Sequence, residues 1–484
     1  MSTSERRAKK PDQIIEIDIL ESSHKGNGIG SFTPPNGVPT PVEVPFAIPG
    51  DKVQTLLLRK RKGVYPSLLK NILVPSPDRQ VPRCVHFGTC GGCRWQQISY
   101  EQQLQKKEAF VRHCFATMLS HRVEVRPIIA CDPPWQYRNK MEFSFSANAA
   151  KERFLGLILD SSRGKIFNLT ECHLVNTWFA DGVKAVRQWW QESGLEAFHP
   201  FRNTGSLRTL TMREGQRSGD RMVILTVSGN PDYALHKQQV ESFVAYLRDA
   251  IEPLSEESQL SVFLRIQQTA KGMATNFYEM HLHGPEHIRE ILYVTSDARE
   301  PPVELTFKIS PAAFFQPNTR QAEQLYSAAM QLVELPKHGI VYDLYCGTGT
   351  LGICAAQKAK QVVGIELSPE ACLDAVANAE SNAVDNVDFH CGSVSAMLHS
   401  LREKGEIGHP DLVMVDPPRA GLDPKAVQEL IDIKPAALLY ISCNPVTQAE
   451  NVAAFLAAGY HLKVIQPVDQ FPHTTHVENI VLLS

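Results

Sequence analysis

The sequence predicts an α/β protein with a small N-terminal β-barrel, a strand-rich central region and a doubly wound, Rossmann-like C-terminal domain. From about residue 320, short apolar runs alternate with Ala-rich helical stretches, which is typical of a parallel sheet with helices on both faces. A Gly-rich loop follows the first of these runs. Near the N-terminus, Gly and Pro turn signals separate short β-rich runs, a pattern typical of a small barrel.

The domain boundaries follow from these changes of pattern along the 484 residues, a length that exceeds one ordinary hydrophobic core. We expect a disordered basic tail over residues 1–11, an OB-type barrel over 12–76, a central domain over 77–318 and the C-terminal domain over 319–484. A run of prolines marks the end of the barrel. The exposed face of such a barrel commonly binds single-stranded nucleic acid.

The composition, 43% apolar and 21% charged, is that of a soluble globular protein. No apolar run approaches the roughly 20 residues that a membrane helix needs. The polar, basic start MSTSERRAKKPDQ lacks the apolar stretch of a secretory signal. We therefore expect a cytoplasmic protein without a membrane partner, in which the eleven cysteines are thiols, ligands or nucleophiles.

The net charge of −3 counts mildly against a nucleic-acid binder, but phosphate contacts come from local patches. Two basic clusters stand out. They are Arg6, Arg7, Lys9 and Lys10 in the tail, and Arg59, Lys60, Arg61 and Lys62 in the predicted barrel. Taken alone, either cluster is explained as well by a solvated run of charge.

A loop of sequence DLYCGTGTLG, residues 343–352, joins the first C-terminal strand to a helix and is a candidate cofactor site. Gly347 and Gly349 let the backbone approach a ligand, and the helix N-terminus adds amide donors. Glu366 ends the next strand, where a carboxylate can accept both ribose hydroxyls. The loop lacks the third glycine of the dinucleotide fingerprint, which favours S-adenosylmethionine. Asp416, in Asp-Pro-Pro-Arg, ends a further strand beside this cofactor.

A cysteine and a glutamate near the C-terminus are the candidate catalytic pair. Cys443 lies in Ser-Cys-Asn-Pro where the fifth strand ends, and Glu478 lies in FPHTTHVE just before the last strand. Carbon 5 of uracil does not attack a sulfonium methyl group unaided, but a thiolate that adds to carbon 6 makes carbon 5 nucleophilic. A general base must then remove the carbon 5 proton so that the thiol can leave. Cys443 and Glu478 would supply both steps.

The motifs DLYCGTGTLG, GIEL, VDPPRAGL, SCNP and FPHTTHVE, in this order, resemble the RNA uracil-5-methyltransferase family. The resemblance covers nearly the whole chain. The N-terminal β unit and the cysteine cluster resemble the bacterial 23S ribosomal RNA branch, which carries a TRAM domain and an iron–sulfur cluster. By this resemblance, Cys443 is the nucleophile and Glu478 is the base. It also implies a set of residues that contact S-adenosylmethionine: Gln316, Tyr345, Thr350, Glu366 and Asp416.

Cys84, Cys90 and Cys93 form a compact cluster with the spacing C-x5-C-x2-C. A structural zinc site usually shows two close pairs of ligands, and only one pair is visible here. An iron–sulfur cluster needs a fourth thiolate. The residues alone leave three candidates open: Cys172, Cys131 and Cys114. The family resemblance implies Cys172 as the fourth ligand of a [4Fe-4S] cluster that holds a substrate-binding surface in shape.

The predicted function is S-adenosylmethionine-dependent methylation of carbon 5 of a uridine in 23S ribosomal RNA by a monomeric enzyme. The same chemistry on transfer RNA is one alternative. An amino-group methyltransferase is another, suggested by Asp-Pro-Pro-Arg, and it would need no covalent nucleophile. An RNA-binding scaffold with an idle catalytic domain is a third, which the intact SCNP and HVE segments disfavour. The resemblance further implies that the helix near residues 98–125 packs with the C-terminal domain.

Overall fold

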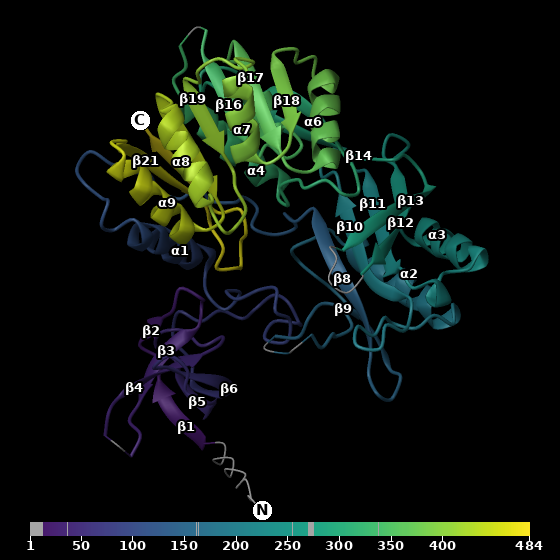
Figure 1. Cartoon of the computed structure of the whole chain (residues 1–484). Coiled ribbons are helices and arrows are strands. Elements are labelled where there is room, and N and C mark those ends of the chain that lie inside the picture. The colour runs from purple at the N-terminus through teal and green to yellow at the C-terminus, as the bar shows by residue number, and fades with distance from the viewer. Residues whose placement is uncertain are drawn as a thin grey trace, which may run out of the picture. The chain divides into compact units, whose positions relative to one another are not determined.

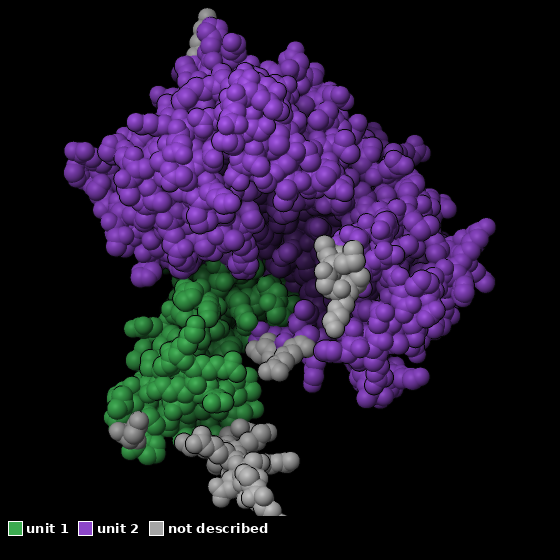
Figure 2. Space-filling model, in the orientation of Figure 1, with its two compact units in different colours: residues 1–106, 473–475 green, residues 107–472, 476–484 purple. Residues whose placement is uncertain are grey.

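The computed structural model describes residues 13–484 apart from 36, 161, 163, 254, 270–274 and 337. The predicted basic tail, residues 1–11, lies outside the described residues. The chain divides into two compact units, one of residues 1–106 with 473–475 and one of residues 107–472 with 476–484 (Figure 2). None of the helices within the described residues has both the length and the apolar character that a bilayer span requires.

The described part of the first unit is built on a single sheet. Its strands are β1 (Gln13–Asp18), β2 (Glu21–Ser22), β3 (Gly28–Phe32), β4 (Thr40–Val44), β5 (Lys52–Leu57) and β6 (Tyr65–Val74). Their order is β1-β5-β6-β4-β3-β2, and every pair is antiparallel except β4 with β6 (Figure 1). Alternate residues, among them Val42, Val44 and Val53, point into the core. The basic residues 59–62 are exposed between β5 and β6. An OB-type closure of this sheet stays a prediction.

The second unit begins with a central sheet and its helices. The strands are β8 (Lys140–Ala147), β9 (Arg153–Gly156), β10 (Leu207–Glu214), β11 (Arg221–Ser228), β12 (Leu260–Gln268) and β13 (Asn276–His283). The helices are α2 (Trp178–Glu192) and α3 (Lys237–Ile251), with a 3₁₀ turn η1 (Pro231–Tyr233) between β11 and α3. The order is β13-β12-β11-β10-β8-β9 (Figure 1). One face packs on α2 and α3 through large side chains such as Phe143, Trp189 and Phe243. The other face carries polar side chains together with Met222, Ile224 and Phe263, which join a second core.

A hairpin and a helix connect the central sheet to the C-terminal one. The hairpin is β14 (Ile288–Val294) with β15 (Val303–Ile309), paired antiparallel, and the helix is α4 (Thr319–Leu332). Asn318 caps α4, because its side chain accepts the amide of Gln321. The apolar residues of the hairpin and of α4 share one core with the C-terminal sheet.

The C-terminal sheet has the order β18-β17-β16-β19-β20-β22-β21-β7 within the described residues (Figure 1). Its strands are β7 (Glu124–Val125), β16 (Ile340–Leu344), β17 (Gln361–Glu366), β18 (Val387–Cys391), β19 (Leu412–Val415), β20 (Ala437–Ser442), β21 (Leu462–Val468) and β22 (Glu478–Leu483). The helices between them are α5 (Thr350–Ala356), α6 (Pro369–Ser381), α7 (Val394–Glu403), α8 (Pro424–Ile433) and α9 (Pro445–Ala457). Ser368, Asp423 and Asn444 each cap a helix that begins with proline, the pattern that best starts a helix at a fixed residue.

Helices cover both faces of this sheet, so the domain is doubly wound. One core contains side chains of α4, α5 and α6. The other contains side chains of α7, α8 and α9, together with Val111 and Phe115 from the helix α1 (Tyr100–Cys114) and its C-terminal extension. The strands between two helical layers are apolar on both faces, as a buried parallel sheet requires.

The sheet is mixed, which corrects the expectation of a parallel one. β22 runs antiparallel to both β20 and β21. Residues 469–477 join β21 to β22 without a helix, and a connection without a crossover returns the chain in the opposite direction. As a result, β22 begins at the edge of the sheet where β20 ends.

Candidate active site

The carboxyl ends of the parallel strands bring together residues that are far apart in the sequence. Tyr345 follows β16, Glu366 ends β17, Asp416 follows β19 and Cys443 follows β20. These strands are neighbours in the order β17-β16-β19-β20 and run parallel, so their carboxyl ends meet at one edge. The antiparallel β22 begins at the same edge with Glu478. This edge of the sheet is the candidate active site.

The register between β20 and β22 places Cys443 beside Glu478. Ser442 pairs with Asn479 in this antiparallel ladder, so Cys443 and Glu478 face each other one step further along it. Glu478 is only 3% exposed, whereas Cys443 is half-buried. A sulfur at the rim of the site and a buried carboxyl next to it can act on the same small ring.

The electrostatics of this pair are dominated by burial. Burial and the carboxyls of Glu478 and Asp416 raise the pKa of Cys443 to about 11, while Arg419 acts in the opposite direction. Burial, followed by the charge of Asp416, raises the pKa of Glu478 well above its ordinary value. Burial raises the pKa of Asp416 to about 7. Two buried carboxyls whose charges act on each other do not both ionise readily.

The loop after β16 has a backbone that few residue types can adopt. Gly349 caps α5 with a φ of 77°, and a Cβ there would lie 2.6 Å from the ring of Phe389. Tyr345 also has a positive φ, 64°, which is costly for a residue with a side chain. The carboxylate of Glu366 closes the loop by accepting the amides of Gly347 at 3.0 Å and Ser368 at 2.9 Å.

Two polar side chains lie beneath this loop. The Asp343 carboxyl is 1% exposed, and its Oδ2 atom has no hydrogen-bond partner among the described residues. Burial raises the pKa of Asp343 to about 8. Thr350 is buried as well, and its hydroxyl lies 3.1 Å from that of Thr348. The loop therefore contains an unused acceptor, whereas Thr350 is satisfied within the loop.

Gln316 lies in the segment before α4 rather than at a strand end. It is 6% exposed, and its side-chain oxygen accepts the amide of Gln470 at 3.3 Å. Its backbone carbonyl accepts the Asn139 amide at 2.9 Å. Gln470 belongs to the connection between β21 and β22, so Gln316 is tied to the segment that leads to Glu478.

The family model described as tRNA (uracil-5-)-methyltransferase matches residues 285–484. An uncharacterised RNA methyltransferase of Protochlamydia amoebophila is 53% identical, and the match covers 92% of this chain and 100% of the relative. The chain belongs to the RNA uracil-5-methyltransferase family. An uncharacterised RNA methyltransferase of Chlorobaculum tepidum is 32% identical, over 99% of this chain and 98% of its own. The crystal structure of Pyrococcus abyssi tRNA (uracil-54, C5)-methyltransferase in complex with S-adenosyl-L-homocysteine shares the fold, with a TM-score of 0.71, 24% identity and coverage of 97% and 99%.

The four cysteines predicted to hold a cluster are divided between the two compact units of this methyltransferase. Cys84, Cys90 and Cys93 belong to the first unit and Cys172 to the second. The Gly92 amide donates to the Cys90 sulfur at 3.3 Å. Across the described residues, no group of three or more His, Cys, Asp or Glu side chains is placed to hold a metal ion. The predicted [4Fe-4S] cluster therefore stays a prediction.

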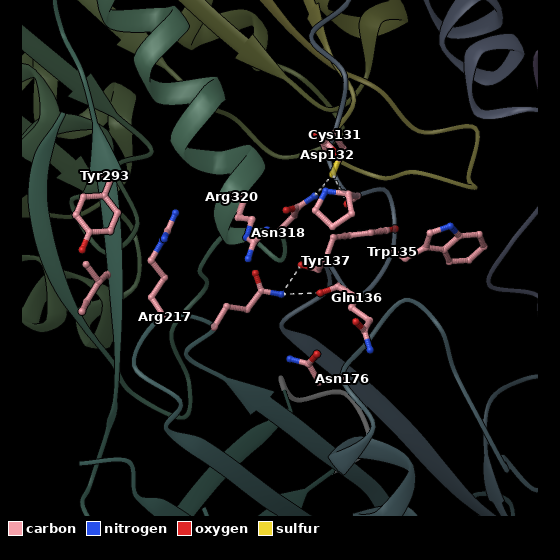
Figure 3. Close-up of a pocket in the computed structure, with 13 residues that line it drawn as sticks. Cys131, Asp132, Trp135, Gln136, Tyr137, Asn176, Arg217, Tyr293, Asn318 and Arg320 are labelled. Carbon is pink, nitrogen blue, oxygen red and sulfur yellow. Dashed lines mark hydrogen bonds between the residues drawn. The ribbon is translucent and has the colours of Figure 1, made fainter. Parts of the chain in front are cut away.

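A cavity of about 460 Å³ opens in the second unit of the methyltransferase, and none of the residues at the sheet edge lines it (Figure 3). The Gln216 side chain donates to the carbonyls of Gln136 at 3.1 Å and Tyr137 at 2.8 Å, as the dashed lines in Figure 3 show. Arg217 forms an ion pair with Glu323 at 2.7 Å. The cavity is therefore separate from the candidate active site at the sheet edge.

Arg419 is a site residue that the sequence analysis did not single out. Its guanidinium lowers the pKa of Cys443, and its Nη2 atom lies 3.3 Å from Nδ1 of His476. Burial and the Arg419 charge lower the pKa of His476 to about 4, so the imidazole is neutral and can accept this hydrogen bond. Arg419 is the last residue of the Asp-Pro-Pro-Arg motif, so the motif could have indicated it. Only the strand order shows that this arginine acts on Cys443.

Proposed function

We propose that this methyltransferase transfers a methyl group from S-adenosylmethionine to carbon 5 of a uridine in 23S ribosomal RNA. The observation that carries the proposal is the β20–β22 register, in which Cys443 and Glu478 are neighbours. A base stacked in a duplex cannot reach such a site, so the target nucleotide must be unpaired or extruded.

The residues at the sheet edge fit S-adenosylmethionine. Glu366 has lone pairs left for the ribose hydroxyls, and the unpartnered Oδ2 of Asp343 is an acceptor suited to an amino or hydroxyl donor. The proposed set of contacts is Gln316, Tyr345, Thr350, Glu366 and Asp416. When bound, S-adenosylmethionine supplies the methyl group as part of an electrophilic sulfonium.

The chain's own residues supply the remaining steps. The Cys443 thiolate forms a bond to carbon 6 of the uracil, and the electron pair of the 5,6 double bond moves so that carbon 5 becomes nucleophilic. Once carbon 5 carries both a hydrogen and the methyl group, Glu478 accepts that proton. The electron pair re-forms the double bond and the sulfur leaves. In its ionised form, a carboxylate whose pKa is raised is a stronger base for this step than an ordinary one.

RNA that contains 5-fluorouridine tests the chemistry, because fluorine on carbon 5 cannot be removed as a proton and the adduct persists. We expect the wild-type enzyme with S-adenosylmethionine to give a covalent protein–RNA band on a denaturing gel. Cys443→Ala should give none, whereas the matched variant Cys114→Ala, which removes a half-buried thiol of α1, should give it. Methylation of RNA without any adduct would favour an amino-group methyltransferase. RNA binding without methylation would favour a scaffold.

Transfer RNA is the second candidate substrate, because the Pyrococcus abyssi protein that shares the fold over 97% of this chain is a tRNA methyltransferase. The choice of 23S ribosomal RNA rests on the N-terminal β unit and the cysteine cluster. Purified enzyme should be incubated with unmodified 23S and transfer RNA transcripts, and 5-methyluridine mapped by mass spectrometry. A mark in transfer RNA alone would contradict the ribosomal assignment.

We also propose that Cys84, Cys90, Cys93 and Cys172 hold a [4Fe-4S] cluster, on the strength of their spacing and the family resemblance. Anaerobically purified protein should then be brown and contain iron and sulfide in equal amounts. Replacing Cys93 with Ala should remove both, and Cys114→Ala should not. Colourless, iron-free wild-type protein would refute this proposal.

We further propose an N-terminal tail over residues 1–11, a TRAM-type barrel over 12–76, a central domain over 77–318 and the catalytic domain over 319–484. The barrel would bind RNA through its exposed basic residues 59–62. Replacing these four residues with Ser should weaken RNA binding and its salt dependence without changing the binding of S-adenosylhomocysteine. We also propose that the enzyme is a cytoplasmic monomer. Light scattering after gel filtration tests its oligomeric state.

A further inference from the structure

The face of the central sheet opposite α2 and α3 carries a group of cations. Lys140 of β8 pairs in register with Arg213 of β10, so both side chains point to the same face. Arg265 of β12 lies on this face too, because its neighbours Leu264 and Ile266 point into the core on the opposite side. The face therefore brings together three basic residues from three strands.

Lys140 has no anion to neutralise it. Within the described residues, its ammonium forms neither a hydrogen bond nor an ion pair. Burial, followed by the charges of Arg213, Arg265 and Arg138, lowers the pKa of Lys140 to about 8, and only Glu142 acts against them. A half-buried ammonium among three guanidinium groups costs free energy in the unliganded protein.

Arg213 has an unused donor. Its side chain is 2% exposed, and its Nη1 atom donates to the Ala313 carbonyl at 3.0 Å. Its Nη2 atom is buried and has no partner among the described residues. Asp374 and Glu290 act on Arg213 through their charges without bonding to it. A buried donor without a partner is rare in native proteins and points to an acceptor that a ligand brings.

The cationic face is joined to the proposed active site. Arg265 donates to the Pro311 carbonyl at 2.9 Å, and Arg213 donates to that of Ala313. Both carbonyls belong to the segment that runs into Gln316. Asn139, next to Lys140 in the chain, holds the backbone of Gln316 itself. Side chains of this face thus hold the segment that we propose to contact the cofactor.

We propose that Lys140 and Arg213 form a binding site for a backbone phosphate of the RNA substrate, close to the target uridine; this inference rests on the proposed function. A phosphodiester oxygen supplies the acceptor that Nη2 of Arg213 lacks and the negative charge that Lys140 lacks. The carboxylates on this face are already engaged, since Glu142 accepts from Thr211 and Glu279 pairs with Arg265. They do not replace the phosphate.

The test measures the binding of a fluorescein-labelled oligouridylate at several salt concentrations by anisotropy. Lys140→Met should weaken binding about threefold to tenfold and reduce the slope of log K against log salt by about 0.7, the value for one lost phosphate contact on a single strand. Lys140→Arg should bind nearly as the wild type does. The matched control is Lys184→Met, which removes an exposed lysine of α2 on the other side of the sheet and should change neither quantity.

An unchanged slope in Lys140→Met would overturn the proposal. So would weaker binding of S-adenosylhomocysteine with unchanged RNA binding, because the site would then hold the cofactor carboxylate. The melting temperature distinguishes a folding defect from a loss of RNA contacts. It should rise in Lys140→Met below pH 8, because the variant removes an ammonium that burial destabilises. If RNA binding depends on Lys140 but the wild type forms no 5-fluorouridine adduct, the phosphate site stands and the proposed function fails.

Discussion

Ser442 and Asn479 are ladder partners between β20 and β22, and this pairing determines which carboxyl lies beside the sulfur of Cys443. The helix α9 holds the pairing in place. Gln448, which is fully buried, donates to the carbonyls of Tyr440 on β20 at 2.8 Å and of Asn479 on β22 at 3.1 Å. It also accepts the Asn479 side-chain amide at 2.7 Å. A shift of one residue would turn Glu478 to the opposite face of the sheet.

Gln448→Met should therefore lower both stability and activity. The substitution keeps the side-chain volume but leaves buried groups of Asn479 and Tyr440 without partners, at a cost of about 1–3 kcal/mol each. Differential scanning calorimetry should show a lower melting temperature, and methyl incorporation should fall further than the folded fraction does. Equal losses of both would mean that Gln448 contributes to stability alone.

Glu478→Gln should stop the reaction after methyl transfer. An amide cannot accept the carbon 5 proton, so turnover should fall about 10²- to 10⁴-fold while the covalent adduct accumulates on ordinary uridine RNA. A denaturing gel detects this adduct, and mass spectrometry should find the methyl group already on the trapped base. An adduct without a methyl group would assign Glu478 to an earlier step.

The thiol of Cys443 should react slowly at neutral pH and faster as the pH rises. With a pKa of about 11, its thiolate fraction increases about tenfold per pH unit up to that value, so alkylation by iodoacetamide should follow the same slope. Peptide mass spectrometry separates Cys443 from the other cysteines. A plateau near pH 7 would contradict the burial argument.

Two variants should shift that profile in opposite directions. Arg419→Met removes the cation that lowers the pKa of Cys443, so its alkylation should slow at any pH below 11. Glu478→Gln removes a carboxyl that raises this pKa, so alkylation should become faster although turnover is lost. The opposite signs distinguish an electrostatic effect from a general disturbance of the site, which would move both variants the same way.

Lys107 and Asp469 form a buried ion pair, both side chains being fully inaccessible to solvent. Lys107 also donates to the Phe471 carbonyl at 2.9 Å, so it anchors the segment that leads to Glu478. Lys107→Met should cost about 3–5 kcal/mol, because it removes the cation that neutralises a buried carboxylate. Adding Asp469→Leu should recover much of the loss in urea unfolding. Additive losses in the double variant would show that the pairing itself is unimportant.

Glu366→Ala should weaken the binding of S-adenosylhomocysteine, measured by isothermal titration calorimetry, about tenfold to a hundredfold. The variant loses an acceptor for the ribose and also the closure of the loop onto the Gly347 amide. RNA affinity should be unaffected. Unchanged binding of S-adenosylhomocysteine would move the cofactor site away from this strand end.

The local chemistry of the proposed site could be recognised along the chain. The structural role of several residues can be inferred from their near neighbours in the sequence. Examples are Gly347 and Gly349 in the loop, the two prolines that follow Asp416, and Cys443, which precedes Asn-Pro. The same holds for the alternation of strands and helices after residue 320. The role of Arg419 and the unused donor of Arg213 could not be recognised, because each depends on a strand that lies elsewhere in the sequence.

The sequence by itself determined which segments become strands and helices and which reactive side chains stand at their ends, since periodicity, capping and turn residues act over a few positions. The tertiary structure alone decided the strand order, the reversed direction of β22 and hence the meeting of Cys443 with Glu478. It also decided the raised pKa values at the sheet edge. These properties arise from burial and from contacts between distant residues, which no local pattern of residues encodes.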